Sequence, residues 1–467
     1  MVTIENKTFD EITVGQTVQL ERMLTNDDIL LFGVMSGDTN PTHYRSEEND
    51  PRQHRVVGHG MWGASLISAL LGNELPGAGT VYKSQNLEFA TTVNLGDTLK
   101  VSITVVEKRP ADHSVVFDCL GVNQKGETVF TGTAVVVAPI EKTRQQRMAL
   151  PEVKVSRGHH VFEQLIEKCS DLVPVSMAIC HPCDEVSLRG AVEAAECGLI
   201  DPVLVGPRKK IESVAEEFGL DIFRYKIVDA EHSHESAARS VALCRSGETA
   251  GLMKGSLHTD EMMHEVARAD TGLRTSRRIS HVFIMDVPSY PRTLLITDAA
   301  INIYPTLEDK ADIVQNAIDL AHVLDIRKPK VALLSAVETV YPKIASTIEA
   351  AALCKMADRG QITGGLLDGP LAFDNAINEE AARIKKIVSP VAGKADILLV
   401  PDLEAGNMLA KQLAYLADAD AAGIVLGARV PIVLTSRADS AKARLASCAV
   451  AVLFAHHRKV ALHLAAE

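Results

Sequence analysis

Residues 293–308 read Thr-Leu-Leu-Ile-Thr-Asp-Ala-Ala-Ile-Asn-Ile-Tyr-Pro-Thr-Leu-Glu, and they decide the fold of the larger part of the chain. The first five residues form a short, mostly apolar run, which predicts a buried strand. Thr306 and Glu308 have the composition of a helix start, and a polar loop separates them from the strand. Strand, loop and helix follow one another in this order repeatedly from about residue 175 onward. Such alternation predicts a mostly parallel sheet with helices on both faces.

The repeated pattern gives a set of strand and helix candidates. Strands are expected at 175–180, 202–205, 249–253, 281–286, 293–297, 331–335, 396–400 and 430–435. Helices are expected at 185–198, 308–324, 343–357 and 440–456. In sheets of this kind ligands bind beyond the carboxyl ends of the strands, so we expect the chemistry in the loops that follow the strands.

The first 138 residues are patterned differently. Short alternating segments separated by turn signals predict an antiparallel sheet, and the stretch 60–71 is apolar all round, as a buried helix is. We therefore expect an α+β domain at 1–138, with its sheet wrapped around one helix. Residues 139–152 lack periodicity and are bounded by prolines, which is typical of a linker.

Composition excludes several classes of function. The chain has 467 residues and a net charge of −12, which argues against a nucleic-acid partner. No apolar run is long enough to cross a bilayer and no secretory signal opens the sequence, so we expect a cytoplasmic protein without a membrane partner. The eight cysteines are scattered, and the pair in Cys180-His-Pro-Cys183 supplies only half of a metal site, so no metal is expected.

A loop in the first domain carries a carboxylate and an imidazole. Asp38 and His43 lie five residues apart in Ser-Gly-Asp-Thr-Asn-Pro-Thr-His, and together they can hold one water for addition to a double bond. The alternative is a simple turn, with Asp38 bonded to its own loop and His43 on the surface. Residues 58–63 match GxGxxG, but no strand precedes them, so a dinucleotide site is not expected. A helix that begins at Gly60 would instead offer backbone N–H groups to an oxyanion.

These residues resemble the MaoC-like family of (R)-specific enoyl-CoA hydratases. The resemblance rests on Phe32 to His43, Gly58-His-Gly-Met61, Ser65 to Ser68 and Leu87-Glu-Phe89 through Gly96-Asp97, and it covers roughly residues 8–138. It implies a hot-dog fold, a hydration pair of Asp38 and His43, an oxyanion contact from Gly60 and a hydroxyl of Ser68 that steadies the aspartate. The strongly polar segment 44–54 departs from the family, which usually has an Ala-rich stretch there.

Four loops of the larger part place polar side chains just beyond strand ends. Lys254, Ser256, His258 and Thr259 follow one strand and suit a phosphate, and Ser436 with Arg437 forms an anion site at a helix start. Asp298 and Asn302 follow a third strand, Asn407 lies beyond a fourth, and Asp439 could act as a base on a thiol. Each group has an alternative role as a helix cap or an ordinary turn, with Asp439 or Ser440 as the cap of the last helix.

A second resemblance follows from these loops. The segments 298–313, Gly369-Pro-Leu-Ala-Phe-Asp374, Pro401 to Asn407 and Thr435 to Ser440 are similar to the phosphate acetyl/butyryltransferase family over roughly residues 155–460. The family implies two α/β lobes, here about 153–297 with 431–467 and about 298–430, and transfer of an acyl group between coenzyme A and phosphate without a cofactor. Ser436 and Arg437 match the family's active-site pair, and Asp439 is closer to the butyryl-type pattern of base.

The sequence thus predicts a hot-dog domain at 1–138, a linker at 139–152 and an α/β transferase domain at 153–467. The expected substrates are acyl-CoA, enoyl-CoA and phosphate, and the expected assembly is a homodimer or higher homo-oligomer. The alternative is a transferase whose hot-dog domain only binds acyl-CoA for regulation.

Overall fold

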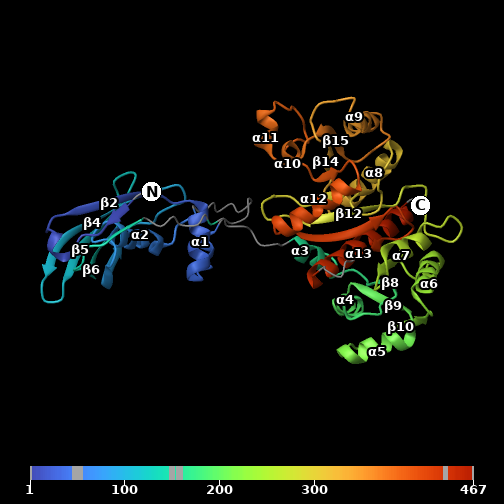
Figure 1. Cartoon of the computed structure of the whole chain (residues 1–467), viewed down its shortest axis with the longest axis horizontal. Helices are drawn as coiled ribbons and strands as arrows, with labels where there is room; N and C mark the ends of the chain where they lie inside the picture. Colours follow the sequence, from blue (N-terminus) through green and yellow to red (C-terminus); the bar gives the residue numbers. More distant parts are fainter. Residues whose placement is uncertain (1–2, 45–55, 147–152, 154–160, 435–439, 465–467) are drawn as a thin grey trace. The chain divides into compact units, whose positions relative to one another are not determined.

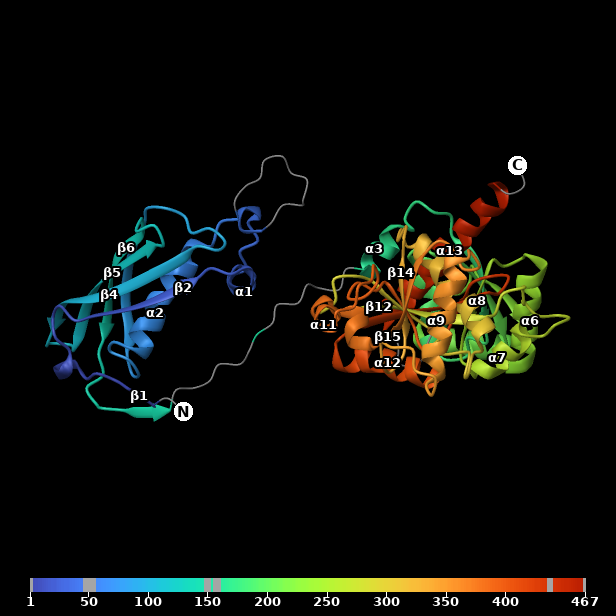
Figure 2. The same ribbon diagram turned by 90° about the horizontal axis from the view of Figure 1, so that it is seen from above.

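The computed structural model describes residues 3–44, 56–146, 153, 161–434 and 440–464 (Figures 1 and 2). The chain divides into two compact units, Met1–Ser156 and Arg157–Glu467. None of the helices in the described ranges is both long and apolar enough to span a membrane.

The first unit is a five-stranded antiparallel sheet with strand order β2-β4-β5-β6-β3. Its strands are β2 (Thr17–Met23), β3 (Val81–Phe89), β4 (Thr98–Arg109), β5 (Ser114–Asn123) and β6 (Thr128–Val137). Side chains of β4 alternate between buried and half-buried, and those of helix α2 (Gly60–Asn73) are buried on most sides. The sheet therefore wraps around α2, which confirms the expected hot-dog arrangement (Figure 2).

A short pair of strands closes this unit. Strand β1 (Thr3–Glu5) pairs antiparallel with β7 (Arg144–Gln146). Next to β1, Asn6 is 1% exposed, and its side chain donates to the carbonyls of Ala78 and Glu141 and accepts from the N–H of Thr143. The segment 139–152 is thus not wholly a linker, because part of it completes the first unit.

The second unit is built on one eleven-stranded sheet with order β10-β9-β8-β11-β18-β17-β12-β13-β16-β14-β15. The strands are β8 (Val175–Cys180), β9 (Ile200–Gly206), β10 (Lys226–Asp229), β11 (Gly251–Lys254), β12 (Ser280–Asp286), β13 (Leu294–Thr297), β14 (Lys330–Leu334), β15 (Leu366–Leu371), β16 (Ile397–Leu399), β17 (Asp420–Leu426) and β18 (Ile432–Val433). One parallel block consists of β10, β9, β8, β11 and β18, and the other consists of β13, β16, β14 and β15. Strands β17 and β12 stand between the blocks and pair antiparallel with each other and with their outer neighbours.

Helices cover this sheet and bury a core of aliphatic side chains. They are α3 (Val161–Glu167), α4 (Glu185–Glu196), α5 (Arg208–Phe218), α6 (Ser233–Ser246), α7 (Thr259–Val266), α8 (Leu307–Val323), α9 (Ala345–Asp358), α10 (Phe373–Ile377), α11 (Glu379–Ile384), α12 (Leu403–Leu416) and α13 (Ala441–Leu464). The long α13 contacts α3 and α4 as well as β17, so the last helix packs against the N-terminal part of this unit.

The strands expected from the sequence are present, and three further strands were missed. These are β10, β15 and β17, which are short, interrupted by Gly369-Pro370, or rich in alanine. Strand β13, which ends just before the lobe boundary expected near 298, pairs in parallel with β16 of the second block. The lobe bounds themselves stay a prediction.

The closure by β7 gives a testable expectation for the isolated first unit. A fragment ending at residue 138 lacks both β7 and the carbonyl of Glu141, so the buried amide of Asn6 loses partners. We expect its free energy of unfolding in urea to be lower by roughly 1–3 kcal/mol than that of a fragment ending at residue 148. Equal stability of the two fragments would show that the β1–β7 pair contributes nothing.

Candidate functional site

The first unit brings Asp38 and His43 together after helix α1 (Asn26–Ser36). Gly37, at φ +73°, ends α1, and Asn40 then caps a short 3-10 turn that carries His43. The Asp38 Oδ2 atom lies 3.7 Å from His43 Nε2, with side-chain exposures of 44% and 13%. His43 Nδ1 lies 2.7 Å from the carbonyl oxygen of Val57, which fixes the ring. A carboxylate and an imidazole this close can share one water or one substrate proton.

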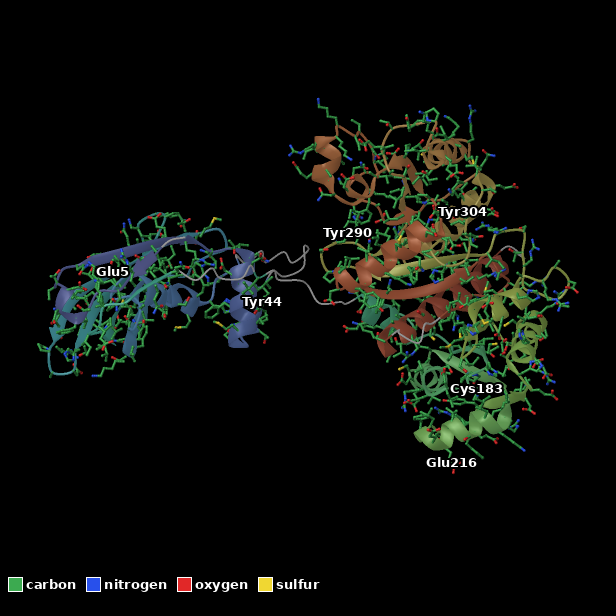
Figure 3. All side chains as sticks on the ribbon, viewed as in Figure 1. Glu5, Tyr44, Cys183, Glu216, Tyr290 and Tyr304 are labelled. Carbon is green, nitrogen blue, oxygen red and sulfur yellow. The ribbon has the colours of Figure 1, made fainter. Side chains whose placement is uncertain are left out.

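The same loop is also held by the turn that the alternative interpretation expected. Asp38 Oδ1 accepts the N–H of Asn40 at 3.0 Å, so only the other carboxylate oxygen faces His43. Tyr44, labelled in Figure 3, donates its hydroxyl to the Asp38 carbonyl at 2.5 Å. That hydroxyl lies 2.1 Å from where a Cβ on Gly33 would be, so any larger residue at this position would displace the Tyr44 side chain.

A second histidine, His59, packs against this pair. Its ring stacks on that of His43 with centroids 3.9 Å apart, and Phe32 contacts its other side at 5.0 Å. Both nitrogens of His59 are buried without a hydrogen-bond partner among the described residues. Burial, and after it the nearby charge of His43, lowers the pKa of His59. A neutral His59 therefore supports the ring of His43 without adding charge to the site.

Gly60 and Ser68 lie on α2. Gly60 is the first residue of the helix, and no side chain caps it. The N–H of Trp62 donates to the carbonyl of His59, so the N–H of Gly60 is the first-turn donor proposed for a ligand. Ser68 is exposed about two turns further along. None of the described hydrogen bonds joins Ser68 to Asp38, and its expected supporting role stays a prediction.

The second unit contains a cavity of about 790 Å³ that collects most of the predicted transferase residues in the described ranges. Lys254, Ser256, His258 and Thr259 line it from the loop after β11, and Asn407 lines it from α12. The remaining lining residues are Leu257, His281, Phe283, Ala300, Ala410, Lys411, Ala414, Tyr415, Ala419, Asp420, Ala421, Leu434, Ser440 and Ala443.

The loop after β11 is built to present donors. Ser256 Oγ donates to the carbonyl of His181 and accepts the N–H of Cys183, which ties this loop to the one after β8. His258 is the N-cap residue of α7 and makes no side-chain cap bond. The first-turn N–H groups of α7 and the ammonium of Lys254 thus lie at one wall of the cavity, where an anion is favoured.

Ser436, Arg437 and Asp439 lie outside the described residues. The chain enters their segment at Leu434 and leaves it at Ser440, and both of these residues line the cavity. Ser440 Oγ accepts the N–H of Ala443, so Ser440 caps α13. Of the two residues that the sequence offered as a cap for this helix, Asp439 and Ser440, it is Ser440 that caps it.

Asp298 and Asn302 organise the loop beside the cavity and are not among the residues that line it. Asp298 is 2% exposed, and its carboxylate accepts the N–H groups of Ala300, Ile301 and Asn302. Burial raises the pKa of Asp298 in spite of these donors. Asn407 Nδ2 donates to the carbonyl of Ala299 at 3.2 Å, which links α12 to the same loop. Their predicted contact with substrate stays a prediction.

Sequence reasoning missed His281, which lines the cavity from β12. It is 2% exposed, and none of the described residues gives Nδ1 a hydrogen-bond partner. The signal available was a histidine inside an otherwise apolar strand. Such a residue is ambiguous until its neighbours are known.

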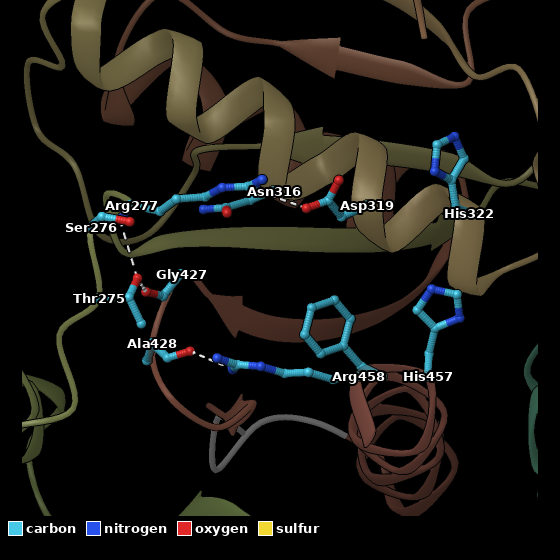
Figure 4. A pocket seen from close by; sticks show the side chains of 11 residues that line it. Thr275, Ser276, Arg277, Asn316, Asp319, His322, Gly427, Ala428, His457 and Arg458 are labelled. Carbon is cyan, nitrogen blue, oxygen red and sulfur yellow. Dashed lines mark hydrogen bonds and ion pairs between the residues drawn. The ribbon is translucent and has the colours of Figure 1, made fainter. Parts of the chain in front are cut away.

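A second cavity, of about 420 Å³, lies between α8 and α13 (Figure 4). Its cations are already engaged: Arg277 pairs with Asp319 at 2.5 Å, and Arg458 donates to the carbonyls of Ala428 and Arg429. His322 Nε2 lies 2.8 Å from the carbonyl of Gly364. The two arginines, His322 and Thr275 of this cavity thus have partners within the protein.

The fold defines a two-unit chain, in which a hot-dog domain precedes an α/β domain with a polar cavity. The sequence profile of the phosphate acetyl/butaryl transferase family matches residues 234–452, and that of the MaoC like domain matches residues 10–120. The chain belongs to the phosphate acetyl/butyryltransferase family and carries a MaoC-like domain ahead of the transferase domain.

Individual relatives agree with this assignment. A phosphate acetyltransferase of Rhizobium meliloti is 67% identical over 300 residues, which are 64% of this chain and 95% of the relative. A phosphate butyryltransferase of Clostridium acetobutylicum is 40% identical over 297 residues, 64% of this chain and 99% of the relative. The crystal structure of a branched-chain phosphotransacylase from Enterococcus faecalis V583 superposes with a TM-score of 0.54 at 30% identity, covering 60% of this chain and 99% of that one.

The loop held by Asp298 gives a second expectation. Asp298→Asn retains the size of the side chain and replaces one acceptor oxygen with an NH2 group that faces N–H donors. We expect the free energy of unfolding to fall by roughly 2–3 kcal/mol, as for a lost hydrogen bond to a charged group. Urea denaturation of the full chain measures this. The matched control is the exposed Asp221→Asn, which should leave stability nearly unchanged.

Proposed function

We propose that the second unit transfers an acyl group between coenzyme A and inorganic phosphate. The observation that carries the proposal is the cavity in which Lys254 and the start of α7 face Asn407 and the two ends of the segment 435–439. In the forward direction a phosphate oxygen attacks the thioester carbonyl carbon and a C–O bond forms. The C–S bond then breaks, and coenzyme A leaves as a thiol that has taken the proton of the phosphate.

Each group at the cavity has a role in this proposal. The ammonium of Lys254 and the N–H groups of α7 hold phosphate, and Ser256, His258 and Thr259 shape that end of the cavity. The fork of Arg437 suits phosphate or the acyl phosphate carbonyl, next to Ser436. Asp439 acts as the base on the thiol, and in the forward direction it passes the proton of the phosphate to the leaving sulfur. No metal or resident cofactor takes part.

The acyl group is proposed to be small. The side chains of Ala410, Ala414, Ala421 and Ala443 line the cavity beside Phe283, which leaves apolar room for a short chain. A relative that is 67% identical is named a phosphate acetyltransferase. We therefore propose acetyl-CoA as the preferred substrate, in a cytoplasmic homodimer or higher homo-oligomer.

The transferase proposal is tested with the full chain. Acetyl-CoA and phosphate should yield acetyl phosphate and free thiol in equal amounts, with butyryl-CoA as the slower substrate. Arg437→Lys retains the charge and loses the planar fork, so we expect turnover to fall by about 10²-fold or more, as when one oriented donor is lost. The melting temperature should not change.

The matched control is Arg383→Lys, on the exposed surface of α11, which should keep full activity. A wild-type chain that releases thiol only by hydrolysis, with no acyl phosphate, would contradict the proposal.

We further propose that the first unit hydrates enoyl-CoA. The observation in favour is the 3.7 Å separation of Asp38 Oδ2 and His43 Nε2 next to the uncapped start of α2. Water held by this pair would add to the double bond, while the Gly60 N–H group binds the developing thioester enolate. The alternative, a regulatory domain that binds acyl-CoA without reaction, predicts binding of crotonyl-CoA with no hydration.

Asp38→Asn separates the two possibilities. It preserves shape and removes the basic carboxylate, so hydration of crotonyl-CoA should fall by roughly 10²–10⁴-fold. Transferase activity should stay at the wild-type level. The control is Asp118→Asn, exposed on β5, which should leave both activities unchanged. A wild-type first unit that binds crotonyl-CoA and never hydrates it would favour the regulatory alternative.

A further inference from the structure

His281 belongs to a wall of the transferase cavity formed by two central strands. Alternate residues of a strand point to the same face, so His281 and Phe283 of β12 lie side by side, and both line the cavity. Across the ladder Phe283 pairs with Gly423 of β17, and Ala421 of β17 also lines the cavity. Beside Asp420 at the start of β17, His281 is the polar side chain of this wall, and its neighbours Phe283 and Ala421 are apolar.

Packing does not explain a histidine at this place. His281 is 2% exposed, its ring contacts Phe283 edge-on at 4.4 Å, and Nδ1 is sealed from solvent with no hydrogen-bond partner among the residues that the structure describes. An unpartnered polar group in such a place lowers stability, whereas a leucine of similar size would not. This cost suggests that the other ring nitrogen of His281, Nε2, binds a ligand.

The surroundings determine where the proton lies. A proton on Nδ1 would be a buried donor with no acceptor in the described part of the chain, so we assign the proton of the neutral ring to Nε2. The Nε2 atom lies over Gly423, 2.7 Å from where a Cβ would be, so the glycine leaves room for this end of the ring. Burial lowers the pKa of His281 to about 4, and the ring stays neutral even though Lys254, Lys411 and Asp420 line the same cavity.

We propose that His281 is a catalytic residue of the transferase, whose Nε2–H group donates a hydrogen bond to the acyl carbonyl oxygen of the thioester. This inference rests on the transferase activity proposed above. When phosphate attacks, the C–O bond forms and the π electrons of the carbonyl move to its oxygen, where the donor stabilises the negative charge. When those electrons return, the C–S bond breaks and the thiol leaves with the proton of the phosphate. His281 keeps its own proton throughout.

The acyl carbonyl is the ligand atom that fits this position. Phe283, Ala421 and Leu434 surround the wall with apolar surface, which suits an acyl chain. The charged donors, Lys254 and the start of α7, come from a different loop and suit phosphate. A neutral donor at the apolar end can polarise a carbonyl without attracting the phosphate to the wrong place.

Three substitutions in the full chain test the proposal. His281→Gln can place an amide N–H near the position of Nε2, His281→Asn places it near Nδ1, and His281→Leu removes the donor. We expect kcat for acetyl phosphate formation to fall by roughly 10²–10³-fold in the Leu and Asn variants, with the KM for phosphate unchanged. The Gln variant should recover most of the activity. The melting temperature of the Leu variant should equal or exceed that of the wild type.

The outcomes are distinguishable. A wild-type chain that forms no acyl phosphate overturns both the transferase and this proposal, whereas an active wild type beside an equally active His281→Leu overturns only the role of His281. Equal losses in all three variants together with lowered melting temperatures mean a packing role and also overturn it.

Two further measurements do not depend on those variants folding. Gly423→Ala retains His281 and displaces its ring, so turnover should fall while Ala at exposed Gly72 of α2 has no effect. In wild-type protein with ¹⁵N-labelled histidine, NMR should show the Nε2–H form of His281 without titration between about pH 6 and about pH 9. An Nδ1–H form or a charged ring in that range would refute the proposal.

Discussion

The antiparallel ladder between β12 and β17 is the interaction on which the second unit depends. Seven residue pairs join the strands, from Ser280 with Leu426 to Asp286 with Asp420. On one side lies a block of parallel strands that ends with β18, and on the other a block that begins with β13. Strands β12 and β17 belong to neither parallel block. Their side chains therefore reach the cavity from the strand faces, whereas the βα repeats contribute side chains from the loops after their strands. His281 and Phe283 are side chains of the first kind.

Several polar residues near the ladder make hydrogen bonds that hold the loops. Asp298 gathers three backbone N–H groups, Asn407 binds the backbone of the same loop, and Ser440 caps α13. These bonds hold the borders of the cavity while the loop after β11 supplies the positive charge. The polar residues of such a site therefore divide into those that fix its walls and those that can contact substrate.

Much of the architecture can be predicted from short segments of the sequence. Apolar runs predict β8, β12 and β13, and the all-round apolar stretch predicts the buried helix α2, because burial on both faces leaves a pattern that one segment can show. Strand β17 begins Asp420-Ala-Ala-Gly, which has low strand propensity, and its conformation comes from pairing with β12. Strand β7 is three residues long and depends on β1, more than a hundred residues away.

The candidate sites also contain some residues that local sequence identifies and others that only the fold identifies. Asp38 and His43 lie on one loop, so spacing alone brings them near each other, and the loop motif of Lys254 to Thr259 follows a recognisable strand. His281 gave no usable signal, because a lone histidine in a strand gains meaning only from the glycine across the ladder and from the absence of a partner for Nδ1. Asp298 was found by its place after a strand, but its role as an organiser of backbone N–H groups depends on the folded loop.

The β1–β7 pair has a consequence for how proteins of this kind arise. It places the entry and the exit of the chain side by side at one point of the hot-dog unit, with Asn6 binding both. A domain whose ends meet needs one point of attachment and no rearrangement of its host. Such a domain can therefore be fused to different proteins without changes to its own core. Its fusion to a transferase requires only a short connecting segment between the two cores.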